Sequence, residues 1–334
     1  MMIDTLSRHA TGVDRGEVIA SLRPDSSTAP IITHRRSRLL RKLSPLPILT
    51  GFLTVCVVAM LVIVLWNIVR GGIGGLTWEF LTTAPREGMT KGGIFPAIFG
   101  TVFLVILMTI FAIPVGVATA IFLRYYASPE SKPARLVRIA VNNLAGVPSI
   151  VFGLFGLGFF IQFVGRGIDK AFYGGNLAFG QPAIIWASLT LAILTLPVVI
   201  VTTEEAMRTI PPDYIEASYA LGATRWQTIR HVVIPNSMTG ILTGGILAVS
   251  RGAGEVAPIM FTGAAYYLPY LPAKLNDQFM ELGYHVYVLS TQSPDVERTL
   301  PLLYSTVLVL LLLTFALNAL AVVIRMRLRV RQVA

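Results

Sequence analysis

Arg251 and Glu255 are charged residues inside an otherwise apolar stretch, residues 237–262. On a helix, residues four apart share one face, so these two side chains could form an ion pair. A charge at membrane depth is costly and therefore faces a cavity or a partner instead of lipid. The pattern predicts that Arg251 helps an anion to cross a membrane while Glu255 holds or gates it. The alternatives are a purely structural ion pair and a position of Arg251 closer to the membrane interface.

Ser149 is a second candidate for such a pathway. It follows Pro148 within a stretch of small residues, 144–153, and the proline frees backbone groups there. The Ser149 hydroxyl could face the pathway of the anion. The alternative is ordinary packing of helices through Gly and Ser side chains.

The stretch 204–236 is polar and lies between two long apolar runs. Prolines break one helix and open another, and Asp213 with Glu216 three residues later has the pattern of a capping box. Gly222 is suited to a left-handed turn, and a following helix is expected to end near Pro235. The segment is predicted to enter a groove on a soluble partner, and the alternative is a long amphipathic connector.

The elements that must position these residues belong to a membrane protein. Of the 334 residues, 54% are hydrophobic and only 13% are charged, and the mean hydropathy is +0.70. This composition is typical of a polytopic, all-α membrane protein. The net charge of +10 is attributed to basic loops that contact anionic lipid, without nucleic acid as a partner. Cys56 is the single cysteine and can form no intrachain disulfide.

Six apolar runs are long enough to cross a bilayer as helices. The expected spans are residues 48–69, 94–123, 139–164, 183–201 (with a possible extension to 207), 237–262 and 300–324. Residues 1–44 are polar and mixed, and they are predicted to form a flexible cytoplasmic tail. Residues 45–334 are then one transmembrane domain with a cytoplasmic loop at 204–236.

The distribution of basic residues predicts the orientation of these spans. With the N-terminus inside the cell, the inner segments hold 19 Lys and Arg residues and the outer segments hold 7. Basic residues concentrate in cytoplasmic loops, so both termini and the stretch 204–236 are expected on the cytoplasmic side.

The chain is not expected to be an enzyme. It contains no Gly-Lys dipeptide and hence no P-loop, so any hydrolysis of ATP must come from a separate subunit. The four histidines are scattered and show no spacing typical of a metal site. We therefore expect no catalytic residue, no cofactor and no metal.

The polar stretch resembles the EAA motif of the permeases of ATP-binding-cassette importers. The matching residues are Glu216-Ala217-Ser218, then Gly222, then the sequence Val-Val-Ile-Pro at 232–235, with mild departures at Ser218, Val232 and Ile234. The resemblance implies a coupling helix over residues 213–225 that inserts into the nucleotide-binding subunit. The coupling residues that it implies are Glu216, Ala217, Gly222, Ala223 and Arg225.

Further segments resemble the permeases of the bacterial high-affinity phosphate importer, the PstA-type member above all. They are residues 76–81, 92–101, 146–154 and 251–258. The resemblance implies a type I ABC importer permease fold in the bacterial inner membrane. It also implies a heterodimer with a second homologous permease, two ATPase subunits, an extracytoplasmic phosphate-binding protein and inorganic phosphate as solute. Val256 stands where the family has threonine, and Arg124 stands where an acidic residue is expected.

Three alternatives remain open at this point. The first is an importer of the same class for another solute, such as sulfate or molybdate, because the EAA-like motif carries no information on the solute. The second is a secondary transporter or channel that works without ATP. The third is a membrane scaffold without transport activity, which leaves the charged pair Arg251 and Glu255 unexplained.

Overall fold

The computed structural model describes residues 45–87, 91–128, 130–293 and 296–333, so the expected tail over residues 1–44 lies outside the described residues. Two compact units divide the chain, residues 1–63 and 64–334. The first unit is represented by the beginning of helix α3 (Pro45–Gly72), and its side chains are exposed from residue 47 to residue 63, Cys56 included. Such an apolar exposed helix is suited to lipid or to another apolar helix.

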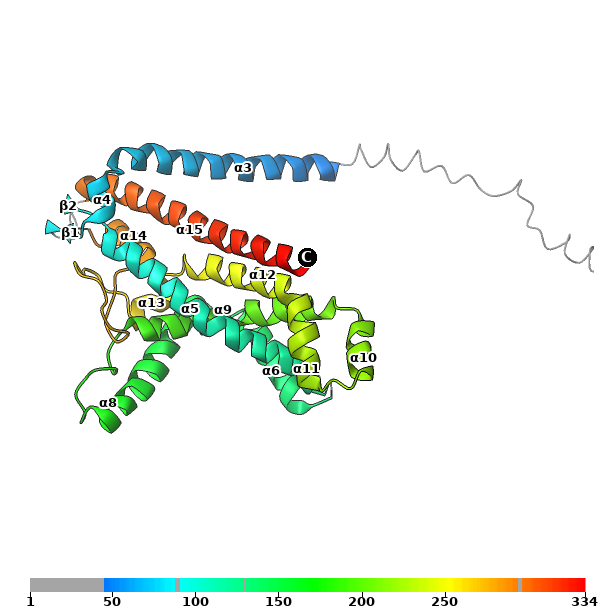
Figure 1. Cartoon of the computed structure of the whole chain (residues 1–334). Helices are drawn as coiled ribbons and strands as arrows, with labels where there is room; N and C mark the ends of the chain where they lie inside the picture. The colour runs from blue at the N-terminus through cyan, green and yellow to red at the C-terminus, as the bar shows by residue number, and fades with distance from the viewer. Residues whose placement is uncertain (1–44, 88–90, 129, 294–295, 334) are drawn as a thin grey trace, which may run out of the picture. The chain divides into compact units, whose positions relative to one another are not determined.

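In its described residues the second unit is mostly helical, with long loops at 173–183 and 263–281 and one short antiparallel pair of strands, β1 and β2 (Figure 1). In chain order its elements after α3 are η1 (Ile73–Gly75), α4 (Trp78–Thr82), β1 (Pro85–Arg86), β2 (Lys91–Gly92), α5 (Phe95–Ile121), η3 (Phe122–Tyr126), α6 (Lys132–Leu144), α7 (Ser149–Phe155), η4 (Gly156–Gly165), α8 (Arg166–Phe172), α9 (Ile184–Arg208), α10 (Pro212–Ala220), α11 (Arg225–Thr228), η5 (Ile229–Val233), α12 (Ile234–Gly252), α13 (Ala257–Thr262), α14 (Leu282–Thr291) and α15 (Val296–Val333). The segments η3, η4 and η5 are π-helical turns within longer helices.

Six helical segments of the described chain are long and apolar enough to cross a membrane, which confirms the expected number. They are Pro47–Gly75, Phe95–Tyr126, Ser149–Phe172, Ile184–Arg208, Arg225–Gly252 and Thr299–Leu328. The predicted extension of the fourth span beyond residue 201 is confirmed, since α9 continues to Arg208.

The predicted boundaries of the third span are wrong. Residues 132–144 form the separate amphipathic helix α6, and the apolar span begins only at Ser149. Pro148 has an extended backbone, with φ −56° and ψ 138°. The proline ring also disfavours the helical conformation of the preceding residue, Val147. The chain therefore leaves the helix at residues 145–148, although its apolar composition continues through them.

The predicted boundaries of the fifth span are also wrong, at both ends. The helix begins at Arg225 and passes Pro235 without interruption, because the π-helical turn η5 precedes this proline and adjusts the hydrogen-bond pattern. It ends at Gly252, and residues 253–256 separate it from α13. Pro258 lies in the first turn of α13, where its missing N–H has no helical partner to lose.

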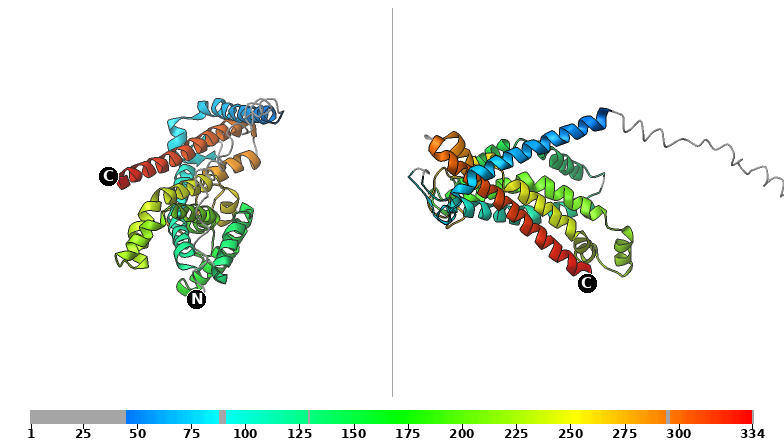
Figure 2. Two further views of the ribbon diagram at one scale, coloured as in Figure 1. Left: turned by 90° about the vertical axis from the view of Figure 1, so that its right-hand side faces the viewer. Right: turned by 90° about the horizontal axis from the view of Figure 1, so that it is seen from above.

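Helices α5, α9 and α12 pack against one another and form the centre of this unit, with α15 against α12 (Figure 2). Small residues allow close approach at these contacts. Gly116 of α5 lies against Val199 of α9, and Gly244 of α12 lies against the Thr202 side chain of α9, so a methyl group at either glycine would collide. Close packing of this kind is the main source of helix association in a bilayer.

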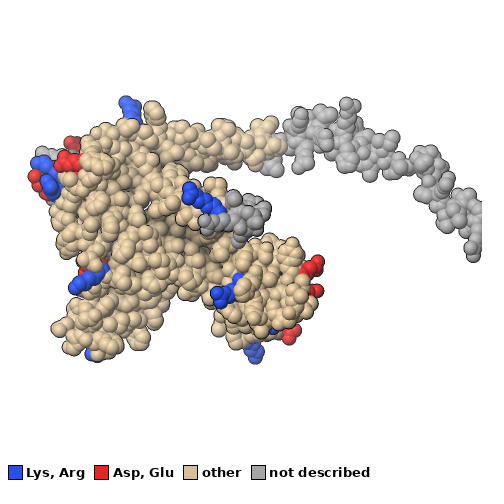
Figure 3. Space-filling model, viewed as in Figure 1, with Lys and Arg blue, Asp and Glu red and all other residues tan. Residues whose placement is uncertain are grey.

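Charged side chains are unevenly distributed on the surface. On the face shown in Figure 3 they gather near the ends of the helices, and the tan surface between them carries almost none. A surface without charge between charged ends agrees with helices that cross a membrane.

Candidate functional site

The break between α12 and α13 carries the charged pair predicted from the sequence. Arg251 is in the last turn of α12, and Glu255 lies in the non-helical connection. The Nε atom of Arg251 is 3.4 Å from Oε1 of Glu255, so the predicted ion pair is confirmed. Because the helix ends at Gly252, the pair does not share the face of a continuous helix as expected. The side chains are 35% and 19% exposed, respectively.

Two contacts fix the end of α12 beside this pair. The Ser250 hydroxyl donates a hydrogen bond of 2.5 Å to Oδ1 of Asn318 on α15. Gly252 lies against the side chain of Met108 on α5, and a methyl group at Gly252 would collide with the Met108 sulfur unless that side chain shifted. The helix end is therefore held from two sides, while Arg251 between them keeps a partly open surface.

Ser149 is the first residue of α7 and is half-buried. Gly153 packs on Pro258, and Gly156 packs on Thr262, so the start of the third span runs alongside α13. Among the described contacts, however, no hydrogen bond joins Ser149 to Arg251 or Glu255. The role of Ser149 in a transport pathway therefore stays a prediction.

Gly222 ends helix α10 in the left-handed conformation, with φ +83°, as its position in the sequence predicts. The N–H of Gly222 donates to the carbonyl of Tyr219 at 2.9 Å, and the N–H of Ala223 donates to that of Ser218 at 3.2 Å. This pair of bonds is a Schellman motif, in which glycine is the residue best suited to the left-handed position. The EAA-like sequence thus forms a short helix and a sharp turn.

The capping box predicted at Asp213 is wrong. Pro211 precedes the helix, so Asp213 lies within the first turn of α10 and no side-chain hydrogen bond caps this end. A capping box occurs instead at the next helix, α11. There the Thr224 hydroxyl accepts from the N–H of Gln227 at 3.3 Å, and the Gln227 side chain accepts from the N–H of Thr224 at 2.8 Å.

The surface of this loop is unusually apolar for a polar segment. Leu221 is 89% exposed, and Tyr214, Tyr219 and Trp226 are exposed as well. Exposed apolar residues gathered on one loop are typical of a surface that binds another protein.

The coupling residues implied by the EAA-like motif lie on the same loop. Glu216, Ala217, Gly222 and Arg225 are exposed, whereas Ala223 is half-buried. The structure therefore leaves four of the five accessible to another protein.

The inner side of the loop is fastened to the membrane helices. Ile215 packs in a cluster with the buried Met207 and Ile229. The hydroxyls of Ser218 and Thr228 lie 2.9 Å apart, which ties α10 to α11. The guanidinium of Arg225 lies 5.5 Å from the ring centre of Tyr126, a cation–π contact with the end of the second span. A force on the loop can thus reach the second and fourth spans directly.

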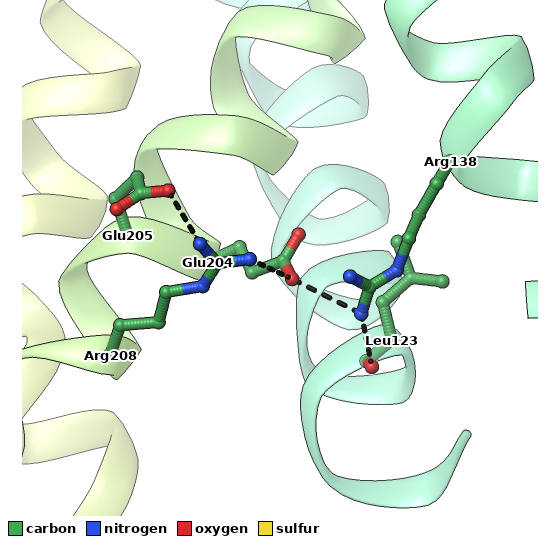
Figure 4. Close-up of polar contacts among 5 residues, drawn as sticks. All are labelled: Leu123, Arg138, Glu204, Glu205 and Arg208. Atoms are coloured by element: carbon green, nitrogen blue, oxygen red, sulfur yellow. Dashed lines mark hydrogen bonds and ion pairs between the residues drawn. The ribbon is translucent and has the colours of Figure 1, made fainter. Parts of the chain in front are cut away.

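Sequence reasoning missed an ion network beside this loop, at the end of α9 (Figure 4). Oε1 of Glu204 lies 3.2 Å from Arg138 of α6 and 3.1 Å from Arg208. Arg208 also pairs with Glu205 at 3.2 Å, and Arg138 donates to the carbonyl of Leu123 at 3.0 Å. Glu204 and Arg208 are four residues apart, a spacing that permits a local pair on a helix, but nothing in the sequence indicated Arg138 as a partner.

The network borders a cavity of about 170 Å³ between α6, α9 and the end of the second span. Glu204 is only 12% exposed in its side chain, whereas Glu205 is 62% exposed. The two adjacent carboxylates therefore form a matched pair for a test of stability.

We expect Glu204→Gln to lower the free energy of unfolding by about 1–3 kcal/mol, because it leaves two guanidinium groups without their shared carboxylate. Glu205→Gln removes an exposed partner and should cost less than about 0.5 kcal/mol. Thermal unfolding of both variants in the same detergent checks this. Equal losses would show that Glu204 is not the centre of the network.

Three comparisons with known proteins agree with this geometry. Residues 112–330 match the family model described as binding-protein-dependent transport system inner membrane component. The chain is 33% identical over 265 residues to the probable ABC transporter permease protein YqgI of Bacillus subtilis, covering 74% of this chain and 85% of that protein. It is 34% identical over 242 residues to the phosphate transport system permease protein PstA 1 of Mycobacterium tuberculosis H37Rv, covering 71% and 73%.

A likeness to solved structures supports the same fold. The crystal structure of a bacterial ABC transporter involved in the import of the acidic polysaccharide alginate matches with a TM-score of 0.61 and 15% identity, covering 87% of this chain and 99% of that chain. At this identity the likeness shows the fold alone, which is that of an ABC importer permease.

Proposed function

Because the chain belongs to the family of binding-protein-dependent transport system inner membrane components, we propose that it is the membrane-spanning permease subunit of an ATP-driven phosphate importer. The observation that carries the solute is the 34% identity over 242 residues to a phosphate transport system permease. The charged pair at the break of the fifth span agrees with an anion as solute.

The proposed orientation places α10 on the cytoplasmic side, together with both termini. The excess of 19 basic residues over 7 supports it. The exposed side of the loop, around Glu216 and Gly222, would then contact one of two separate ATPase subunits. Closure of these subunits on ATP would push the loop, and Ile215 and Arg225 would transmit the movement to the spans.

The proposed pathway runs past Arg251, Glu255 and Ser149, between this chain and a second homologous permease. An extracytoplasmic binding protein would deliver phosphate at the outer side. Arg251 offers the anion one compensating charge. Without an anion, Arg251 forms its ion pair with Glu255. One guanidinium is a poor match for a phosphate dianion, so the partner permease would supply further donors.

Reconstitution into proteoliposomes tests this function. The chain, the co-purified second permease and ATPase, and a phosphate-loaded binding protein should together give uptake of labelled phosphate that requires ATP. Excess unlabelled phosphate should compete, whereas sulfate and molybdate should not. Uptake without ATP would contradict the importer, and transport of sulfate or molybdate in preference would contradict the solute.

A further inference from the structure

Glu281 and His285 are ionisable residues buried in the described structure, and the proposed pathway uses neither. Glu281 precedes α14 and is 2% exposed, and His285 lies one turn later and is 4% exposed. Neither forms an ion pair among the described contacts. A buried carboxyl group without a cationic partner holds its proton more tightly than an exposed one.

The Glu281 carboxyl group bridges α14 and the second span. Its Oε2 accepts the N–H of Tyr284 at 2.6 Å, which caps the first turn of α14. Its Oε1 lies 3.4 Å from Oγ1 of Thr101 on α5. The same hydroxyl accepts the N–H of Leu282 at 3.0 Å and donates to the carbonyl of Ala97 at 2.8 Å.

Counting hydrogens around Thr101 indicates the state of Glu281. A hydroxyl has one hydrogen and two lone pairs. The hydrogen is used in the short bond to Ala97, and one lone pair is used by Leu282. The remaining lone pair faces Oε1 of Glu281, so this contact is favourable when Glu281 carries a proton and donates it. If Thr101 turned its hydrogen to an ionised Glu281, the shorter bond to Ala97 would be lost.

Burial raises the pKa of Glu281 to about 7, against the opposing effect of the N–H groups of Gly283 and Tyr284 and of the Thr101 hydroxyl. Both states of the carboxyl group are therefore populated near neutral pH. Burial also lowers the pKa of His285 to about 4, so its imidazole is neutral there. Its Nδ1 atom is buried without a hydrogen-bond partner in the described structure.

The first turn of α14 is in direct contact with the break of the fifth span. Gly283 lies against the side chain of Val256, the residue after Glu255, and a methyl group at Gly283 would be 2.8 Å from it. Just before α14, the carbonyl oxygen of Met280 lies close to Gly100 of α5. A change at Glu281 therefore reaches both α5 and the segment that carries the Arg251–Glu255 pair.

We propose that Glu281 is a proton-binding site that positions the break between α12 and α13. In the protonated state, Glu281 donates to Thr101 and holds the first turn of α14 against α5 and Val256. Loss of the proton places lone pairs of Glu281 and Thr101 face to face and loosens this contact. The site is a positioning device, because Glu281 itself does not touch the proposed pathway pair.

Other ionisable groups lie on the elements packed around Glu281. Those with described side chains are Tyr284, His285 and Tyr287 on α14, Tyr266, Tyr267, Tyr270, Lys274 and Asp277 in the preceding loop, Arg251 and Glu255 at the break, Glu79 on α4, and Glu297, Tyr304, Arg325 and Arg327 on α15; α5 has none. Of these, His285 shows a lowered pKa, so it titrates well below Glu281.

The sign of the pH dependence follows from the raised pKa. The folded chain binds the Glu281 proton more tightly than the unfolded chain, so this stabilisation is complete below pH 4.5 and is lost as the pH rises through about 7. His285 acts in the opposite sense, since its neutral form is stabilised above pH 6.5 and this stabilisation is lost as the pH falls towards about 4. Comparison of wild type with Glu281→Gln cancels the contribution of His285.

Infrared spectroscopy of the full-length chain in lipid nanodiscs, with the subunits that co-purify, tests the proton site directly. The difference between wild type and Glu281→Gln should show the carbonyl band of a protonated carboxylic acid, which disappears with a midpoint near pH 7. Absence of this band at about pH 5, or its loss well below neutral pH, would overturn the proposal. This readout does not depend on which solute the protein carries.

The isosteric Thr101→Val variant tests the direction of the hydrogen bond. It removes the lone pair that accepts from protonated Glu281, so the midpoint of the infrared band should move to lower pH. A move to higher pH would show that Thr101 donates to an ionised carboxylate, and it would overturn the proposed arrangement. If this variant fails to fold, the titration of the wild-type band still decides whether Glu281 holds a proton.

The positioning role has its own readout in transport. The ratio of wild-type uptake to Glu281→Gln uptake cancels the titration of the solute. It should fall with the protonated fraction of Glu281, by up to about tenfold as the pH rises from about 6 to about 8. If the ratio is constant but the infrared titration is as expected, Glu281 is a proton-binding site that does not position the break, and the positioning role is overturned. If the wild type shows no uptake, the proposed importer function is contradicted, whereas the infrared result on the proton site still holds.

Discussion

Arg251→Gln is expected to reduce ATP-driven phosphate uptake by at least about tenfold while the chain remains folded. A charge-assisted hydrogen bond contributes roughly 1.5–3 kcal/mol, and 1.4 kcal/mol corresponds to a factor of ten. Glutamine can still donate hydrogen bonds, so the loss reports the missing positive charge. The guanidinium has Glu255 as its ion-pair partner in the described structure, which leaves it able to exchange this carboxylate for a passing anion.

Two further variants at the break separate charge from structure. Arg251→Lys keeps the charge without the planar guanidinium and should retain part of the uptake. Ser250→Ala is the matched control, because Ser250 bonds Asn318 on α15 and takes no part in the charged pair. Its uptake should stay within about twofold of the wild type, as expected for loss of one partly exposed hydrogen bond.

Glu255→Gln is expected to have a smaller effect than Arg251→Gln. It releases Arg251 from its carboxylate but leaves the positive charge at the break. Initial rates of uptake over a range of phosphate concentrations measure both the rate and the apparent affinity. Unchanged uptake in both Arg251→Gln and Glu255→Gln would exclude the pair from the pathway.

Glu216→Lys is expected to uncouple ATP hydrolysis from transport. Glu216 is exposed on α10, and no described hydrogen bond or ion pair holds it within this chain, so reversal of its charge should leave the fold intact. If the loop contacts an ATPase subunit, the change disrupts a contact between proteins. A like charge placed at such a contact costs several kcal/mol, so we expect uptake to fall by more than about tenfold.

The measurement is ATP hydrolysis by the reconstituted assembly with and without the loaded binding protein. Stimulation by the binding protein should disappear in Glu216→Lys. Glu297→Lys is the control, because Glu297 is exposed in the first turn of α15, on a different element. Normal stimulation in Glu216→Lys would show that this side of α10 does not contact the ATPase.

Local chemistry explains which features of the coupling loop were predictable. Gly222 takes φ +83°, and glycine is the residue that tolerates this conformation without strain, so the turn follows from its type and position. The capping box was assigned to the wrong helix, because the Asp213–Glu216 and Thr224–Gln227 patterns are similar in sequence. With the two prolines before Asp213, the helix begins at Pro212, two residues earlier than a cap at Asp213 requires, and this decides between them.

Apolar composition alone could not give the ends of the third and fifth spans. Residues 139–164 and 237–262 are apolar throughout, yet backbone breaks at residues 145–148 and 253–256 divide them. Prolines near each break indicated where a helix could end, but Pro235 has the same signal and the helix continues through it. Whether a proline ends a helix depends on neighbouring turns and on packing, which a composition window does not contain.

The sequence by itself determined the membrane class, the six spans, the turn at Gly222 and the pairing of Arg251 with Glu255, because each depends on composition or on residues close in the chain. Only the tertiary structure showed three contacts: the ion pair of Arg138 with Glu204, the polar contact of Thr101 with Glu281, and the packing of Gly283 against Val256. These partners are far apart in sequence, and helix packing brings them together. The burial that raises the pKa of Glu281 is a property of that packing and has no local signal in the chain.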